Sequence, residues 1–318
     1  MTLINHFHCF KGSEKIQKLK LKLTIMKRFT LKEFKNNYPN DDACLDKVFQ
    51  LRYKNLVCPK CESDKPFNRV DGRRSYYCPS CAFQIYPTKG TIFEKSTTSL
   101  SDWFLIIYMQ TVTRNGVSAK EIERTLNVCY KTALRMAHQI KILMANRTIE
   151  PLTGVIEGDE TFIGGLNKFR HEDKKVQDSQ GRSGKDKTPV IGVIKRGGGI
   201  IAKVVDNTSG ATIKPFIEQS VVKDASVLVT DEWLGYSGIN KTMPHVVINH
   251  NEKEYVRGAF HTNTIEGFWS QLKRTIKGTH IHVSREHLQK YVDEVNFRYT
   301  HRDKQDQMFE ITLSQIVS

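Results

Sequence analysis

Residues 154–165 have the sequence GVIEGDETFIGG. At this stretch the predicted secondary structure of the chain changes from helices to strands. Pro151, just before it, and Gly154, its first residue, end a helical pattern, because proline lacks the amide hydrogen that a helix interior needs. After it, apolar runs between polar breaks predict strands at 155–164, 190–195, 200–205, 226–230 and 246–248, and helices at 210–220, 263–276 and 284–300. We therefore expect residues 151–304 to form an α/β domain, with a mixed sheet flanked by helices.

Three carboxylates occupy special places in this domain. Asp159 lies inside the first predicted strand, Asp231 closes the strand of SVLVTDEW, and Glu266 lies near the start of the helix of HTNTIEGFWSQLKR. Acids on a central strand, a neighbouring strand end and a facing helix can surround two divalent ions, which clamp the attacking and leaving oxygens in a displacement at phosphorus. Such oxygen ligands favour Mg²⁺ or Mn²⁺. Three nearby acids are easily confused with them: Glu157, Glu160 and Glu232.

The helix at 263–276 has two predicted faces. Glu266 and Lys273 are seven residues apart and share one face, so Lys273 is expected on the carboxylate side, placed to touch a DNA phosphate. The acids also have structural interpretations: Asp159 as a surface acid, Asp231 as a cap of the following turn, and Glu266 as part of a capping box that begins at Asn263. The other face is an apolar stripe of Ile265, Trp269, Leu272 and Ile276.

The strongest local pattern is a pair of Cys-x-x-Cys motifs, Cys58 with Cys61 and Cys78 with Cys81, separated by sixteen residues. Four thiolates at this spacing can bind one tetrahedral Zn²⁺, and they leave no open position for catalysis. We expect a zinc-ribbon domain over 29–98, against the alternative of unliganded or redox-active cysteines. The odd total of seven cysteines and the absence of a secretory signal favour a metal site in a reducing compartment. The remaining cysteines are interpreted as small buried or unpaired residues: Cys9, Cys44 and Cys129.

Residues 99–150 are predicted to be helical and to contain a helix-turn-helix over 117–140. Ser118 can cap the first helix, and a turn at 127–128 precedes a second helix with an apolar face. An ordinary helical hairpin is the alternative interpretation. The other face of the second helix carries side chains suited to DNA phosphates and base edges: Lys131, Thr132, Arg135 and Gln139.

The formal net charge of +15 also favours a polyanionic partner, and we expect double-stranded DNA. An anionic membrane surface is the rival partner. No apolar run approaches the ~20 residues of a membrane-spanning helix, and the partner we expect is DNA, not a membrane. Residues 1–28 contain seven Lys or Arg and one Glu. We predict that this extension is disordered, with a basic DNA-binding arm as the alternative. The polar stretch 167–188 is predicted to be a functional or disordered loop, and 305–318 a C-terminal tail.

In this order, the motifs resemble those of a known family: CPKC with YYCPSC, GDETFIGG, VTDEWLGY, HTNTIEGFWSQLKR and HLQKYVDEVNFRYTHR, over roughly 40–303. The chain resembles the DDE transposases of bacterial insertion sequences that carry an N-terminal zinc ribbon and an ISXO-type catalytic domain, a group related to the eukaryotic Merlin transposases. The resemblance implies an RNase H-like fold, with Asp159 and Asp231 as the first two metal ligands. It implies Glu266 or, failing that, Asn263 as the third ligand, and Lys273 as the basic residue that follows.

The resemblance also implies a function. The N-terminal modules would bind inverted repeats at the ends of an element, and metal-activated water would nick the DNA to free a 3′-hydroxyl that attacks target DNA. Joining two ends implies a homodimer or a larger assembly. The protein would act in the cytoplasm at the nucleoid, or in the nucleus of a eukaryotic host. Two alternatives stay open: a domesticated DNA-binding regulator without catalysis, and a nuclease that cuts without strand transfer.

Overall fold

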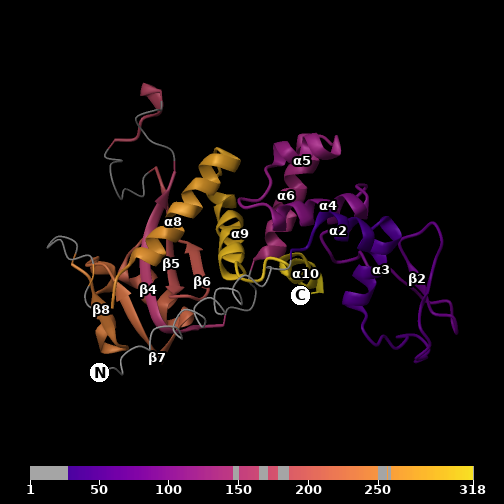
Figure 1. Cartoon of the computed structure of the whole chain (residues 1–318), viewed down its shortest axis with the longest axis horizontal. Coiled ribbons are helices and arrows are strands. Elements are labelled where there is room, and N and C mark those ends of the chain that lie inside the picture. The colour runs from indigo at the N-terminus through magenta and orange to yellow at the C-terminus, as the bar shows by residue number, and fades with distance from the viewer. Residues whose placement is uncertain are drawn as a thin grey trace, which may run out of the picture.

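A computed structural model describes residues 28–145, 150–164, 171–177, 186–249, 256 and 259–317. Most of the basic extension and most of the polar loop at 167–188 lie outside the described residues, so the predictions for them stay predictions. The chain has two halves side by side, with zinc-motif and helical elements in one and the sheet in the other (Figure 1).

The N-terminal half begins with two helices and a small sheet. Helix α2 (Leu31–Asn37) starts at a capping box between Thr30 and Glu33, and α3 (Asp41–Arg52) starts where Asn40 accepts a hydrogen bond from the Ala43 amide. Three two-residue strands then pair antiparallel in the order β1-β2-β3. These strands are β1 (Asn68–Arg69), β2 (Tyr76–Tyr77) and β3 (Gln84–Ile85).

Three longer helices complete this half: α4 (Leu100–Val112), α5 (Ala119–Leu126) and α6 (Tyr130–Met144). Ser99 caps α4, and Ser118 caps α5 as expected; Asn127 has the left-handed backbone that ends α5 before the turn. The predicted apolar face of α6 is also confirmed, because its four residues are all buried: Ala133, Met136, Ala137 and Ile140.

The C-terminal half contains the five-stranded mixed sheet that the strand pattern predicts. Its order is β6-β5-β4-β7-β8; β5 runs antiparallel to β4 and β6, whereas β7 and β8 run parallel to β4. Strand β4 is therefore central. The strands are β4 (Leu152–Ile163), β5 (Thr188–Lys195), β6 (Ile200–Val204), β7 (Val221–Thr230) and β8 (His245–Val247).

Helices cover both faces of this sheet. Helix α7 (Gly210–Ser220) packs on one face, whereas α8 (Asn263–Thr275) and α9 (Leu288–Thr300) pack on the other. Figure 1 shows α8 crossing the sheet over β4 and β5, with α9 between the sheet and α6. The apolar stripe predicted for α8 is confirmed, since its four residues are buried in the core on that face: Ile265, Trp269, Leu272 and Ile276.

The segment that the sequence analysis names a C-terminal tail contains a helix. Residues Met308–Ser314 form helix α10, which belongs to the core of the N-terminal half. The Phe309 ring lies 5.8 Å from the Phe34 ring and 6.2 Å from the Phe104 ring, measured between centroids. The aromatic partners of Phe309 on α2 and α4 lie more than 200 residues earlier in the chain, so nothing beside this short apolar pattern in the sequence marks it as buried.

Candidate functional site

The structure brings three carboxylates together at one end of the parallel pair β4 and β7. One ligand oxygen from each of Asp159, Glu160 and Asp231 lies within 4.8 Å of the other two. Strand register explains the meeting of two of them. Glu157 is paired with Val229 in the parallel ladder, so two residues further on Asp159 comes level with Asp231. Asp159 and Asp231 are thus joined as the sequence predicts, and Glu160, which the sequence pattern marks only as a neighbouring acid, joins them.

The three carboxylates repel one another in a partly buried place. Burial raises the pKa of Asp159 to about 7, and the negative charges of Glu160 and Asp231 contribute to the increase. A bound divalent cation would offset this repulsion and keep the carboxylates ionised. Three convergent carboxylates also form the all-oxygen donor set that Mg²⁺ or Mn²⁺ accepts. These residues therefore fit a divalent metal centre.

Trp269 on α8 holds the Asp159 carboxylate in place. Its indole Nε1 donates a hydrogen bond to Oδ2 of Asp159 at 3.0 Å. The ring lies over β5 at Gly192, which is paired with Asp159; a Cβ on Gly192 would come within 2.7 Å of a Trp269 ring carbon. Only glycine leaves this space, so the β5 sequence also supports the position of Asp159.

Asp231 and Glu160 have their own hydrogen bonds. The Trp233 amide donates to Oδ1 of Asp231 at 3.0 Å, so the turn-capping interpretation of Asp231 holds alongside its place in the cluster. Tyr236, which is buried on the α7 side of the sheet, donates its hydroxyl to Oε2 of Glu160 at 3.1 Å. Both bonds come from the segment after β7, which therefore orients two of the three acids.

Glu157 has a different role, because it fixes the start of α8 against the central strand. Its carboxylate is fully buried and accepts hydrogen bonds from the amides of Thr264 at 2.8 Å and Ile265 at 3.1 Å. Arg196 completes the arrangement with an Nε–Oε1 contact of 3.0 Å to Glu157 and with bonds to two carbonyl oxygens just before α8. A strand residue thus caps the helix, which no local pattern in the sequence indicates.

Glu266, the expected third ligand, lies elsewhere. It is exposed, and its Oε1 accepts a hydrogen bond from the Thr262 hydroxyl at 3.0 Å. Among the described residues, the acids that meet within 4.8 Å do not include it. The capping box with Asn263 is not formed either, since Thr262 occupies the cap position without a side-chain cap bond and Glu157 binds the first amides. Glu266 is thus exposed, lies outside the cluster and does not form the expected capping box.

Lys273 lies where the helical spacing predicts it, on the Asp159 side of α8. Burial lowers the pKa of Lys273, while the negative charge of Asp159 acts in the opposite direction. The Lys273 side chain is within range of the negative charge of Asp159, and it is exposed to solvent.

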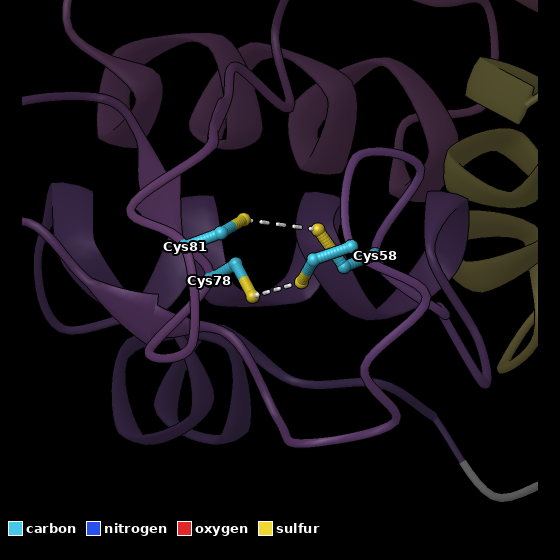
Figure 2. Close-up of side chains that lie close together, drawn as sticks. Cys58, Cys78 and Cys81 are labelled. Carbon is cyan, nitrogen blue, oxygen red and sulfur yellow. Dashed lines mark hydrogen bonds between the residues drawn. The ribbon is translucent and has the colours of Figure 1, made fainter.

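The four cysteines of the paired motifs converge in the N-terminal half. Their sulfur atoms all lie within 4.8 Å of one another, with 3.6 Å between Cys58 and Cys81 and 3.7 Å between Cys61 and Cys78 (Figure 2). Sulfur atoms on a tetrahedron with metal bonds of about 2.3 Å are spaced at about 3.8 Å, so the set fits Zn²⁺.

Both cysteine loops have the same backbone. Each first cysteine accepts the amide of the residue four positions on, Glu62 for Cys58 and Ala82 for Cys78, and both of those residues have positive φ. Repeated loop geometry of this kind directs two sulfur atoms of each loop to a common point.

The expected DNA-contacting face of α6 is open to solvent. Lys131 and Arg135 are exposed, and Thr132 and Gln139 are partly exposed. The only described partner of the Arg135 guanidinium is the Glu94 carbonyl oxygen, at 3.4 Å. None of the described helices has the length and apolar composition to cross a membrane.

Two known domains match the chain. Residues 39–84 match a transposase zinc-ribbon domain, and residues 151–300 match an ISXO2-like transposase domain. The chain is also 27% identical, over 263 residues, to an uncharacterized protein in transposable element ISH50 of Halobacterium salinarum. That alignment covers 78% of the chain and 87% of the relative.

Proposed function

Because the chain belongs to the transposases that combine a zinc ribbon with an ISXO2-like domain, we propose that it cleaves and joins DNA strands at the ends of an insertion element. The observation that carries this proposal is the meeting of Asp159 and Glu160, inside β4, with Asp231, just after the end of β7. The sheet order, with a central β4 between an antiparallel and a parallel neighbour, supports an RNase H-like fold.

In this proposal, Asp159 and Asp231 hold divalent metal, with Glu160 or Glu266 as the third carboxylate. A bound pair of Mg²⁺ ions supplies an activated water and stabilises charge at the phosphorus. Trp269 keeps the Asp159 carboxylate turned toward the centre, and Lys273 binds a phosphate of the DNA beside it. Glu157 is a positioning residue. Its hydrogen bonds fix the start of α8, and the start of α8 determines where Trp269 and Lys273 lie.

DNA recognition falls to the N-terminal half in this proposal. The zinc ribbon and the α5–α6 pair bind the element end, with Lys131, Thr132, Arg135 and Gln139 facing the DNA. The exposure of these side chains on one helix supports such a role. Two ends have to be held for joining, so we propose a homodimer or larger assembly on DNA, acting where the host DNA is.

The decisive test is a cleavage and strand-transfer assay with duplexes made from the DNA that flanks the coding sequence, in Mg²⁺ or Mn²⁺. We expect Asp159→Asn and Asp231→Asn to abolish both reactions while DNA binding is retained, because a metal pair without one of its carboxylates loses its geometry. Glu232→Gln is the matched control, since this acid is next to Asp231 but outside the cluster. Nicking without joining would indicate a nuclease, and binding with no reaction a regulator.

The third carboxylate is identified by two further substitutions in the same assay. Glu160→Gln and Glu266→Gln each remove one negative charge and keep the side-chain shape. If Glu160 is the ligand, Glu160→Gln loses activity and Glu266→Gln retains it. The reverse result would mean that α8 moves Glu266 toward the cluster when metal and DNA bind. Full activity in both variants would contradict a three-carboxylate centre built from these residues.

A further inference from the structure

A second positively charged feature lies between the two halves, away from the face of α6. It is a cleft of about 870 Å³ lined by five arginines, which we call the arginine cleft: Arg28, Arg114, Arg274, Arg298 and Arg302. These residues come from the start of the described chain, the link between α4 and α5, helix α8, helix α9 and the segment after α9. No acidic residue is among the described residues that line it. Such a lining repels cations and attracts anions.

Most of this charge is not balanced by neighbouring carboxylates. Of the five arginines, only Arg298 forms an ion pair with an acid in the part of the chain that is described, namely with Glu294 at 2.7 Å. Arg302 donates to the carbonyl oxygens of Gly198 and Tyr299. Arg274 donates to a carbonyl of its own helix.

A buried group adds a second observation. Arg298 is only 6% exposed, yet its Nε has no hydrogen-bond partner within the described residues. A buried donor without a partner is costly, and an anion or an ordered water in the cleft would supply one.

Helix α8 connects the arginine cleft to the acidic cluster. Gln271 and Arg274 line the cleft, whereas the neighbouring residue Lys273 is within range of the charge of Asp159. Successive helix residues are turned by about 100°, so Lys273 and Arg274 occupy adjacent parts of the exposed surface of α8. A polyanion that crosses this surface would contact the arginine cleft and the acidic cluster together.

We propose that the arginine cleft binds phosphates of duplex DNA and thereby holds the strand that enters the acidic cluster. This inference rests on the proposed function, because it names a further part of the same DNA path. Arginines from separate segments suit an extended row of phosphates, and their planar donor groups match phosphate oxygens. The cleft is distinct from the surface of α6, so it would contribute phosphate contacts independent of base recognition.

The test measures binding of a fluorescein-labelled 30-base-pair duplex of random sequence to the full chain, by anisotropy, between 50 and 200 mM salt. Arg114→Ala and Arg274→Ala are the informative variants, because neither side chain is bonded to a second element in the described structure. The slope of log affinity against log salt should fall by about 0.9 for each phosphate that is no longer neutralised, and by about twice that in the double variant. Arg114→Lys and Arg274→Lys should recover most of the slope.

Lys223→Ala is the control, since it removes one positive charge at the opposite end of β7 from Asp231. Its slope should match that of the wild type.

The proposal for the arginine cleft alone would be overturned if the wild type binds the duplex and the double arginine variant has the same slope and affinity, with an unchanged unfolding midpoint. A wild type that binds no duplex would overturn the proposed function as well. A 30-nucleotide single strand is the last arm: if the substitutions weaken only its binding, the duplex proposal is wrong.

Discussion

Lys141 on α6 and Glu294 on α9 form an ion pair with 3.0 Å between Nζ and Oε2, and neither side chain is exposed to solvent. The other carboxylate oxygen of Glu294 accepts hydrogen bonds from Arg298 at 2.7 Å and Gln110 at 2.5 Å. Gly116 has positive φ and lies against the same carboxylate, so a Cβ there would collide with it. One buried carboxylate thus ties α4, α6 and α9 together across the two halves.

We expect Glu294→Gln to lower the free energy of unfolding by about 3–5 kcal/mol, because it leaves Lys141 and Arg298 as buried cations without their carboxylate. Urea unfolding at pH 7 measures the change. Glu218→Gln is the control, since its pair with Lys223 is solvent-exposed and should contribute no more than about 1 kcal/mol. A Glu294→Gln variant within about 1 kcal/mol of the wild type would mean that the two halves do not depend on this group.

The same carboxylate predicts a pH dependence of stability. Burial acts to raise the pKa of Glu294, but Lys141 and Arg298 outweigh burial and lower it to about 2. Because the pKa in the folded state lies below the unfolded value of about 4.3, the stabilisation is fully present above that value and disappears as the pH falls toward 2. Its full size is on the order of 3 kcal/mol.

The measurement compares the wild type with Glu294→Gln at several pH values. The difference in unfolding free energy between them should shrink as the pH falls from 6 to 2.5. A difference that stays constant over this range would argue against a lowered pKa at Glu294.

The cysteine cluster predicts one zinc ion per chain. Elemental analysis of the purified protein should give a zinc-to-chain ratio near one, and Cys58→Ser should reduce it because three thiolates no longer close the tetrahedron. Cys129→Ser is the matched control, since Cys129 is exposed and outside the cluster. A protein that keeps its fold and DNA affinity after complete chelation would show that the cluster has no structural role.

The face of α6 predicts sequence-dependent DNA binding. Arg135→Ala should weaken binding to the DNA that flanks the coding sequence more than binding to a random duplex, because base contacts specify and phosphate contacts do not. A bidentate bond to a base contributes about 1–3 kcal/mol of discrimination, measured by competition between the two duplexes. Arg124→Ala, on the exposed face of α5, should affect both duplexes alike. An equal loss on both duplexes for Arg135→Ala would exclude α6 as the reading helix.

The periodic parts of the fold are predictable from the sequence alone. The apolar stripe of α8 and the capping serine of α5 depend on spacing within one element, and both are confirmed. The meeting of Asp159 and Asp231 is predictable too, because an acid inside a central strand and an acid at the end of a neighbouring strand can lie side by side. The residues that escape prediction depend on contacts between distant segments. Glu157 caps a helix that starts more than 100 residues later, while the local sequence after Thr262 suggests a cap of its own.

Glu160 escapes prediction for a physical reason. Alternation along β4 places neighbouring side chains on opposite faces of the sheet, so two consecutive acids are not expected in one cluster. Its partner Tyr236 belongs to a segment after β7 whose path no pattern in the sequence predicts. The path of that segment places the Tyr236 hydroxyl next to Glu160 and so orients Glu160 in the cluster with Asp159 and Asp231.

The return of α10 to the N-terminal half has a consequence for protein synthesis. Phe309 and Leu313 complete a core whose other members begin at Phe34, so the C-terminal half has to be synthesised before that core can close. Products of early stop codons or frameshifts therefore lack part of the N-terminal core. We expect the cell to degrade such fragments.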